Sequence, residues 1–366
     1  MKAHFLFLAV ALFFVACTSR QESGVPTIQV EPMAIKNSPD ELFESCKVIF
    51  LDSTRKALLT NPQKIMSTDD YYFISDNWKQ IKVFDKEGRF VSEVNRVGRS
   101  GQEYLNVTNF DVVGSTVYVL SRGNKKLYVY DIRGKYINSY ELDDWYAEAL
   151  MVDSNMALLF SGNSNDKMKN YVLFDLKQGK SVAECDDFSV NAGLLMGQMH
   201  LTRANGEILT SKIFDYNIYQ YDNNAIIPIL NLAFDTKDAL PHDDDNREIA
   251  RKTDLKKVVR NYETFTRVGN KIFVIYSLLM NTDSPTPYGF KFLTAANIKD
   301  NSAKTISFGL QTSERFPLGT GAGSTFIEDA LYTLISPWSY NHKTTDSTKH
   351  IDEEANFVLL EYKLKH

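Results

Sequence analysis

An eight-residue phrase that recurs along the chain constrains its fold more than any other feature. Residues 84–91 read FDKEGRFV, and residues 130–137, which begin 46 positions later, read YDIRGKYI. In each copy a β-type run ends, an Asp-x-x-Gly turn follows and a second β-type run begins. Asp suits the first turn position because its side chain bonds the turn backbone, and Gly suits the exit because it adopts positive φ. A repeat of this period indicates a fold built from copies of one supersecondary unit.

Weaker copies of the phrase continue the repeat towards the C-terminus. They lie at residues 174–180, 221–224, 296–298 and 360–362. The last two intervals are too long for the period unless segments are inserted, and the candidate insertions are residues 236–262 and 339–356. Without these two segments the period stays near 46–48 residues, so the phrase marks six successive units.

Each unit contains four short β-type runs. In the first two units they include residues 71–74, 81–84 and 90–94, then 109–113, 117–120, 127–130 and 136–140. Four strands in a unit of this length are the signature of a β-propeller blade. The sequence therefore predicts an all-β, six-bladed propeller of four-stranded blades, with a solenoid as the alternative.

The sixth unit supplies only three strands of its own. An incomplete blade would leave an open sheet edge. Residues 46–51, which read CKVIFL, form an orphan strand just before the first unit. We expect this N-terminal strand to complete the last blade and to close the ring.

The first insertion changes character along its length. It begins with acidic residues and continues with apolar residues at roughly helical spacing between basic ones, which predicts a short helical insertion near residues 245–261. We expect this helix to lie over or beside the channel mouth. The sequence His242-Asp243-Asp244-Asp245 has carboxylates of the kind that bind Ca²⁺. Its spacing matches no known calcium loop, and a solvated acidic loop is the favoured interpretation.

The N-terminus carries export signals. Residues 5–16 form an apolar stretch that is too short to span a bilayer and follows Lys2, as in a secretory signal peptide. The sequence Val15-Ala16-Cys17 resembles a bacterial lipoprotein box, with Phe14 where Leu is usual. An ordinary signal peptide with an incidental cysteine is the alternative. The resemblance implies a signal peptide at 1–16 and a lipidated Cys17 that opens a flexible tether at 17–40, followed by the propeller at 41–366.

Together the signal, the lipoprotein box, the tether and the six degenerate blades resemble the six-bladed β-propeller lipoproteins of Bacteroidetes, which are related to NHL-repeat propellers. Residues 97–104, which read VGRSGQEY, are similar to the Gly-rich connector between NHL-type blades. The resemblance extends over residues 46–366. It implies the fold and a location in the cell envelope, with a lipid anchor in the outer membrane, and it leaves the activity open.

Charge and cysteine content narrow the possible partners. The formal net charge is −5 and the pI is about 5.8, which argues against nucleic acid as a partner. Beyond Cys17 only Cys46 and Cys185 remain. They could form a disulfide in an oxidising compartment, but their expected positions in blades six and three favour free thiols.

Propeller topology sorts the loops between two faces. Because successive strands are antiparallel, the Asp-x-x-Gly turns between third and fourth strands share one face. The loops between second and third strands share the other face with the connectors between blades. Trp78, Trp145 and Trp338 all fall in loops of this second face, together with both insertions. We call it the tryptophan face, and we interpret it as the binding surface because scaffolded loops carry function. The alternative for each tryptophan is that it covers the core beside its own blade.

Several side chains are candidates for binding. Aromatic rings suit stacking on sugars or peptide side chains, and arginines suit carboxylate or sulfate. Arg99 has an alternative partner in Glu103. His200 and Thr202 share one orientation on the fourth inner strand and Leu201 and Arg203 the other, so only one set is expected to face the channel; a structural role for His200 is favoured over a catalytic one. The candidates are Trp78, Arg96, Arg99, Arg122, Trp145, Tyr146, His200, Tyr216, Trp338 and Tyr340.

These features favour a non-catalytic lipoprotein that binds a glycan, peptide or envelope protein. The sequence contains no G-x-S-x-G, H-E-x-x-H, P-loop or C-x-x-C motif, and we expect no catalytic residue, metal or cofactor. The alternative is a lyase or hydrolase at the channel mouth, as resemblance to NHL-type propellers implies. A purely structural subunit of an envelope complex is a third option.

Overall fold

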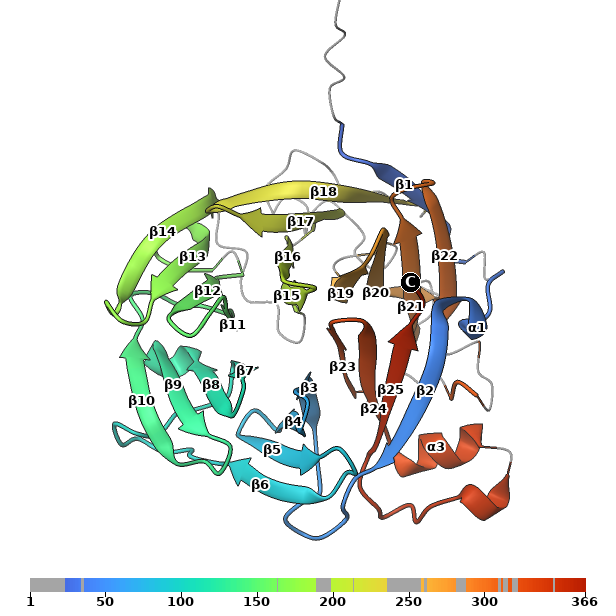
Figure 1. Ribbon diagram of the computed structural model, residues 1–366, viewed down its shortest axis with the longest axis horizontal. Coiled ribbons are helices and arrows are strands. Elements are labelled where there is room, and N and C mark those ends of the chain that lie inside the picture. The colour runs from blue at the N-terminus through green and yellow to red at the C-terminus, as the bar shows by residue number, and fades with distance from the viewer. Residues whose placement is uncertain are drawn as a thin grey trace, which may run out of the picture.

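The β-type runs of the repeat form antiparallel four-stranded sheets, and six such sheets stand in a ring around a central axis (Figure 1). This computed structural model describes residues 24–33, 36–162, 164–188, 199–212, 214–235, 258–259, 262–280, 288–308, 311, 315–317, 322–344 and 346–366. The prediction of an all-β, six-bladed propeller is confirmed.

Each blade runs from an inner strand at the axis to an outer strand at the rim. Blade one is β3 (Pro62–Ser67), β4 (Tyr71–Asp76), β5 (Gln80–Asp85) and β6 (Phe90–Val94). Blade two is β7 (Asn109–Val113), β8 (Thr116–Ser121), β9 (Lys126–Asp131) and β10 (Tyr136–Glu141). Blade three is β11 (Glu148–Met151), β12 (Met156–Phe160), β13 (Lys169–Asp175) and β14 (Lys180–Asp187). Blade four is β15 (Leu201–Ala204), β16 (Glu207–Ser211), β17 (Asn217–Asp222) and β18 (Ala225–Phe234).

Blades five and six complete the ring. Blade five is β19 (Tyr262–Val268), β20 (Lys271–Met280), β21 (Tyr288–Asn297) and β22 (Ser302–Ser307). Blade six is β23 (Ala322–Ile327), β24 (Ala330–Ile335), β25 (Val358–Leu364) and the N-terminal β2 (Phe43–Phe50). Short helical segments are α1 (Pro39–Leu42), η1 (Arg122–Asn124), α3 (Pro337–Lys343) and η2 (Ser347–Lys349).

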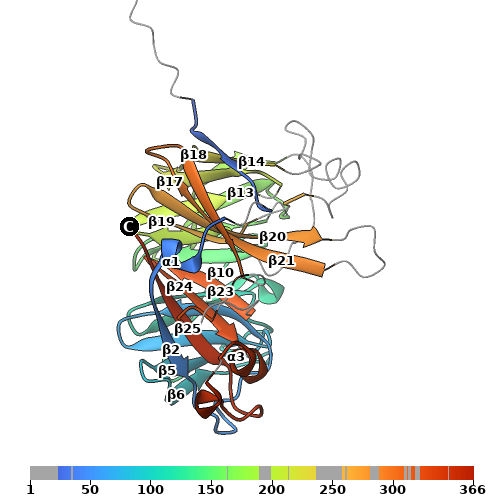
Figure 2. The ribbon, with the colours of Figure 1, turned by 90° about the vertical axis from the view of Figure 1, so that its right-hand side faces the viewer.

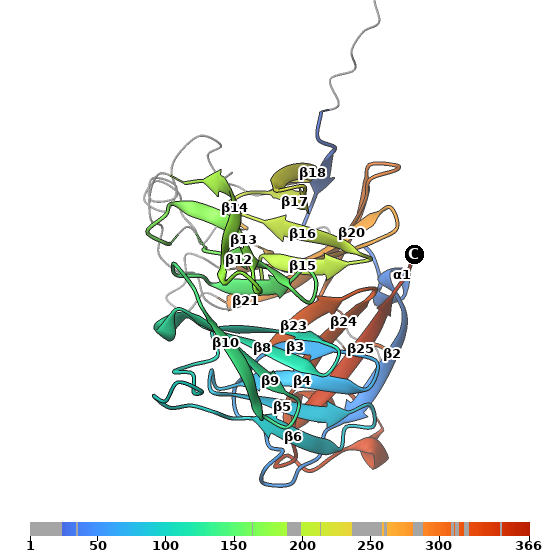
Figure 3. The same cartoon turned by 60° about the vertical axis from the view of Figure 1, so that its left-hand side comes forward.

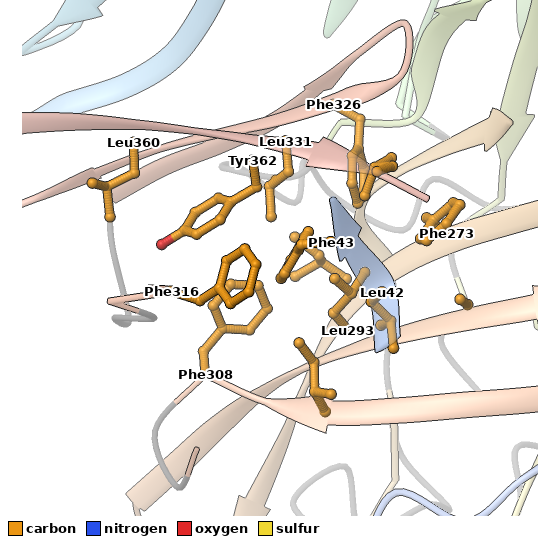
Figure 4. Close-up of a cluster of buried hydrophobic side chains, with 14 of the residues drawn as sticks. Leu42, Phe43, Phe273, Leu293, Phe308, Phe316, Phe326, Leu331, Leu360 and Tyr362 are labelled. Atoms are coloured by element: carbon orange, nitrogen blue, oxygen red, sulfur yellow. The ribbon is translucent and has the colours of Figure 1, made fainter. Parts of the chain in front are cut away.

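Closure of the ring follows the prediction made for residues 46–51. Strand β2 pairs antiparallel with β25, with Cys46 opposite Tyr362, and becomes the outer strand of blade six. Phe43 at its start is fully buried and its ring centroid lies 4.8 Å from that of Tyr362. Figure 4 shows Leu42 and Phe43 inserted among side chains of blades five and six. The two ends of the propeller are therefore joined by main-chain hydrogen bonds and by a shared apolar cluster.

A further N-terminal strand corrects the predicted tether. Strand β1 (Thr27–Val30) pairs in parallel with the end of β18, which makes the sheet of blade four five-stranded. Ile28 and Val30 are buried in the cluster between blades four and five. The prediction of a flexible tether up to residue 40 is therefore wrong for residues 27–30, because two alternating apolar side chains dock this stretch onto blade four.

The Asp-x-x-Gly phrase forms the predicted turns, and these turns also contact the neighbouring blade. Asp85 Oδ1 accepts hydrogen bonds from the backbone N–H of Glu87 and of Arg89, and Gly88 takes a φ of +83°. The Gly88 carbonyl accepts the N–H of Asp52, just beyond the outer strand of blade six. Likewise, a Cβ on Gly134 would lie 2.8 Å from the carbonyl oxygen of Glu93 in blade one. Each of these turns thus rests on the outer strand of the preceding blade.

Blade twist explains this contact. Strands twist relative to their neighbours, so the outer strands β6, β10, β14 and β18 run along the circumference in Figure 1. Figure 3 shows β10 running steeply across the direction of β8. A turn between the third and fourth strands therefore reaches the rim of the preceding blade, and the division into two faces does not hold at the rim.

The predicted helix near residues 245–261 and the acidic sequence at 242–245 lie outside the described residues, apart from Val258 and Val259, which are buried. The flanking strands β18 and β19 belong to different blades, so the first insertion is a connector between blades, as expected. The second insertion, between β24 and β25, contains α3. Among the described helices none is long and apolar enough to cross a membrane.

Candidate functional site

Inner strands of five blades enclose a small cavity near the axis of the ring, which we call the axial cavity. Its volume is about 50 Å³. The side chains that line it come from β3, β7, β11, β15 and β23 with the residues beside them: Lys64, Met66, Asp111, Glu148, Ala149, Leu150, Met199, Leu201, Thr202, Arg203, Thr325, Phe326, Ile327 and Glu328. Five of these residues have ionisable side chains (Lys64, Asp111, Glu148, Arg203 and Glu328), which makes the cavity a candidate site.

An ion pair joins blades two, three and four across this cavity. Arg203 Nη2 lies 3.1 Å from Asp111 Oδ2 and also donates to the carbonyl of Met151. Asp111 is almost fully buried, and its two oxygens also accept the N–H of Val112 at 2.8 Å and of Met151 at 2.7 Å. This carboxylate therefore accepts hydrogen bonds from three donors, namely Arg203 Nη2 and the N–H groups of Val112 and Met151.

Lys64 brings a second cation to the cavity from blade one. Its Nζ donates to the carbonyl of Phe110 at 2.7 Å and to Asn109 Oδ1 at 3.3 Å. Burial lowers the pKa of this ammonium group, because removal from water penalises the charged form, and the nearby carboxylates Asp111 and Glu148 partly oppose the shift.

Glu148 clamps the start of β15 to blade three. Its Oε1 accepts the N–H of His200 at 2.7 Å and its Oε2 accepts the N–H of Leu201 at 3.1 Å. Burial raises the pKa of Glu148 to about 7, against the lowering effect of these hydrogen bonds and of Lys64. The clamp is thus a buried carboxyl group that titrates near neutral pH.

His200 is a buried neighbour of this clamp and packs in the core. Burial lowers its pKa to about 4, its Nδ1 lies 3.0 Å from Ser211 Oγ, and its ring lies 4.8 Å from that of Phe160. Its Nε2 is buried and has no partner among the described residues. These contacts support the structural interpretation of His200.

The expectation that only one set of β15 side chains faces the channel stays a prediction. Leu201, Thr202 and Arg203 all line the axial cavity. In a propeller the edge of the inner strand points to the axis, while its two faces pack on the neighbouring blades. Residues of both sets therefore border the cavity at the strand edge.

The tryptophan face presents one strongly exposed aromatic platform. Trp338 lies on α3 with 61% of its surface exposed, and its ring is stacked on His342 with 5.2 Å between centroids and 7° between planes. Residues four apart share one side of a helix, so α3 holds both rings together. The side chain of Ser336 caps the helix by accepting the N–H of Ser339.

The other two tryptophans are partly buried. The Nζ of Lys125 lies 4.4 Å from the ring centroid of Trp145, which is a cation–π contact. Trp78 lies in the turn between β4 and β5 with a φ of +56°, and its carbonyl accepts the N–H of Val107 at 2.8 Å. The ring of Trp145 thus contacts Lys125, whereas Trp78 binds the following connector through its backbone carbonyl.

Three candidate tyrosines prove to be packing residues. Tyr146 is buried and donates to Asp143 at 2.9 Å, and Tyr340 is buried with its ring against Phe50. Tyr216 packs its ring against Phe234, with a buried hydroxyl that has no partner among the described residues. Burial leaves little surface of Tyr146 and Tyr340 for a ligand, whereas Tyr216 is only partly buried, and ligand contact by these three residues stays a prediction.

The candidate arginines differ in the hydrogen bonds that their guanidinium groups already make within the protein. Arg96 Nε donates to the carbonyl of Gly134 at 2.8 Å, in the turn of the next blade. Arg122 Nη2 donates to the carbonyl and hydroxyl of Ser164 in blade three. Both arginines join blades, while Arg99 is exposed. Glu103, its suggested partner, accepts the N–H of Ser100 at 2.9 Å.

Cysteines and metal ligands add no reactive centre to the described part of the chain. Cys46 on β2 and Cys185 on β14 are both free thiols, in blades six and three as expected. Within the described residues no three His, Cys, Asp or Glu side chains are grouped so as to hold a metal ion.

Sequence reasoning did not identify the polar residues of the axial cavity. Lys64, Asp111 and Glu148 lie within or at the start of inner strands, beside apolar residues. A charged residue at a strand position that should be buried is the signal that could have found them.

Comparisons with known proteins support the fold. The chain is similar to a predicted exported protein from Bacteroides fragilis NCTC 9343, with 16% sequence identity, coverage of 93% of this chain and 100% of that chain, and a TM-score of 0.75. It is also similar to a member of the DUF4221 family from Bacteroides vulgatus, with 12% identity, coverage of 88% and 98%, and a TM-score of 0.53. A comparison with curated proteins found no match.

The match to a protein family is nearly complete. The family described as "Domain of unknown function (DUF4934)" matches residues 25–363, which spans β1 and all six blades. The NHL-repeat relationship remains a resemblance. The chain belongs to the DUF4934 family.

Proposed function

We propose that this protein is an exported, lipid-anchored propeller that binds a glycan, a peptide or an envelope protein through α3 and the tryptophan face. The observation that carries the proposal is the exposure of Trp338, whose ring is fixed by stacking on His342. A rigid exposed indole offers contact area at low entropic cost, and for this reason tryptophans dominate many binding surfaces.

The position of the N-terminal strand supports an anchored arrangement. Strand β1 lies at the opposite end of the molecule from α3 in both Figure 1 and Figure 2. A lipid on Cys17 would reach the propeller through β1 and blade four, which leaves α3 pointing away from the membrane. The structural neighbour from Bacteroides fragilis, a predicted exported protein, is consistent with an envelope location.

Lipidation is tested by substitution of the anchoring residue. Cys17→Ser removes the thiol that would be acylated, so we expect the protein to shift from the membrane fraction to the soluble fraction and to lose labelling by a fatty-acid probe. Cys46→Ser is the matched control and should keep both properties. Unchanged labelling of Cys17→Ser would refute the anchor.

Binding is tested with the soluble chain from residue 24. We expect Trp338→Ala to weaken the strongest glycan or peptide hit from array screening by at least about tenfold in Kd, because a central aromatic contact is lost. Ile137→Ala removes another exposed apolar side chain, on β10 of blade two, and serves as the control. Equal affinity of Trp338→Ala and wild type would place the site elsewhere.

An enzyme at the channel is the second candidate, favoured by the raised pKa of buried Glu148. Both oxygens of this carboxyl group are already bonded to backbone N–H groups. The axial cavity, at about 50 Å³, is also much smaller than the roughly 300 Å³ or more of a typical small-molecule pocket. The geometry therefore favours binding over catalysis on a sugar or peptide.

A further inference from the structure

The N-terminal segment that precedes the ring is held in two separate parts. The first part is β1, which pairs with the end of β18 on blade four and contacts β22 of blade five at the rim (Figure 1). The second part begins at Asn37, whose Oδ1 accepts the N–H of Thr305 on β22 at 3.1 Å. Glu41 in α1 then pairs with Lys304 at 2.8 Å, and β2 completes blade six. The two parts therefore depend on different contacts with the ring.

The first part is held much less extensively than the second. Strand β1 has four residues and buries two side chains, those of Ile28 and Val30. Strand β2 has eight residues paired with β25, and Leu42 and Phe43 add to the apolar cluster that joins blades five and six. A short edge segment with few buried side chains opens at a lower free energy than the core strands. We therefore expect β1 to leave blade four while blade six stays closed.

We propose that β1 is a releasable strand that sets how far the propeller stands from its membrane anchor, a role that rests on the proposed acylation of Cys17. With β1 docked, nine residues (18–26) separate Cys17 from the strand, and they span at most about 30 Å. With β1 released, 21 residues (18–38) precede α1, and their maximum span is about 70 Å. Because β1 lies between Cys17 and the ring, a pull on the anchor acts on β1 before it reaches β2.

Hydrogen exchange of the whole mature protein, in water and in low urea, tests whether β1 is releasable. We expect the amides of β1 to exchange at least about tenfold faster than those of β2, at a rate that changes little with urea, because local opening exposes little surface. Equal rates with the same urea dependence would show that β1 leaves only when the ring unfolds, and would overturn the proposal.

Substitutions on the two sides of β1 supply a matched pair of variants. Ile28→Asp/Val30→Asp places two charges at buried positions, so it should release β1 and leave its amides unprotected while those of β2 keep their protection. Thr27→Asp/Gln29→Asp adds the same charges at exposed positions and should leave β1 docked. Loss of protection of β2 in the first variant, or equal protection of β1 in both variants, would also overturn the proposal.

Neutron reflectometry of the acylated protein on a supported bilayer tests the reach. The root-mean-square lengths of chains of nine and 21 residues differ by roughly 10 Å. The protein layer should therefore lie about that much farther from the bilayer for Ile28→Asp/Val30→Asp than for Thr27→Asp/Gln29→Asp. Equal distances would refute the role of β1 in setting the reach. If neither variant nor the wild type attaches, the anchor at Cys17 is refuted and the reach role with it, while hydrogen exchange still decides whether β1 is releasable.

Discussion

Gly88→Ala is expected to lower the free energy of unfolding by at least about 3 kcal/mol. A non-glycine residue at positive φ costs about 1–2 kcal/mol, and Gly88 has a φ of +83°. An added Cβ would also press into the carbonyl oxygen of Phe50 in blade six. Because that atom belongs to the backbone of a paired strand, relief requires the two blades to separate, which adds about 1–3 kcal/mol.

The repeat itself supplies the control for this prediction. Gly179 occupies the corresponding turn of blade three with a φ of +64°, but an added Cβ there meets nothing within 4 Å. Gly179→Ala should therefore cost only the conformational part, about 1–2 kcal/mol. Gly134→Ala should fall between the two. Urea unfolding measures the loss of unfolding free energy in the three variants, provided that their m-values are equal. Equal losses for Gly88→Ala and Gly179→Ala would refute the idea that the turn holds neighbouring blades together.

These turns show how far the repeat could be read from sequence. The Asp-x-x-Gly pattern depends on bonds within four residues, and the structure confirms them at Asp85 and Asp131. The contact of Gly88 with Phe50 depends on how two blades twist against each other, and nothing within the phrase encodes it. The fold was predictable because it follows from local patterns repeated six times.

The candidate binding residues were harder to predict for the same reason. Sequence placed Trp338 and Tyr340 in one loop, but α3 turns Trp338 outward and Tyr340 into the core beside Phe50. Side chains two positions apart on a helix point in different directions. Because the segment was predicted to be a loop, the sequence did not indicate which of the two side chains would be exposed. The tether prediction failed at β1 because Ile28 and Val30 are only two apolar residues in a polar stretch.

The clamp between blades three and four leads to the second large effect, which concerns pH. Glu148 has a folded pKa of about 7 against an ordinary value of 4.5. Between these values the folded protein holds a proton that the unfolded chain has released, so the contribution of Glu148 to stability falls as pH rises. His200 has a folded pKa of about 4 against 6.5. There the unfolded chain holds the extra proton, so the contribution of His200 rises with pH.

The two contributions are opposite in sign and overlap between about pH 4.5 and 6.5. Each amounts to about 3 kcal/mol, because one pKa unit corresponds to about 1.4 kcal/mol. In the wild-type protein they largely cancel. A free energy of unfolding that changes little with pH in the wild-type protein would therefore conceal two large and opposite protonation effects. Single substitutions separate these two effects.

Glu148→Gln should become more stable relative to wild type, by about 3 kcal/mol, as pH rises from 4.5 to 7, whatever the initial loss from the weakened clamp. His200→Asn should become less stable relative to wild type by a similar amount between pH 4 and 6.5, since the rising contribution of the histidine is absent. Urea unfolding at several pH values measures both differences. Glu353→Gln, in an exposed loop, is the control and should give a constant difference.

Parallel profiles for Glu148→Gln and wild type would mean that the carboxyl group is ionised in the folded protein throughout this range. The clamp would then hold a permanent negative charge near Lys64, in addition to the ion pair between Arg203 and Asp111. Opposite slopes for the two variants would instead show that Glu148 is neutral below about pH 7. In that state Lys64 and Arg203 share the cavity with Asp111, Glu328 and an uncharged Glu148.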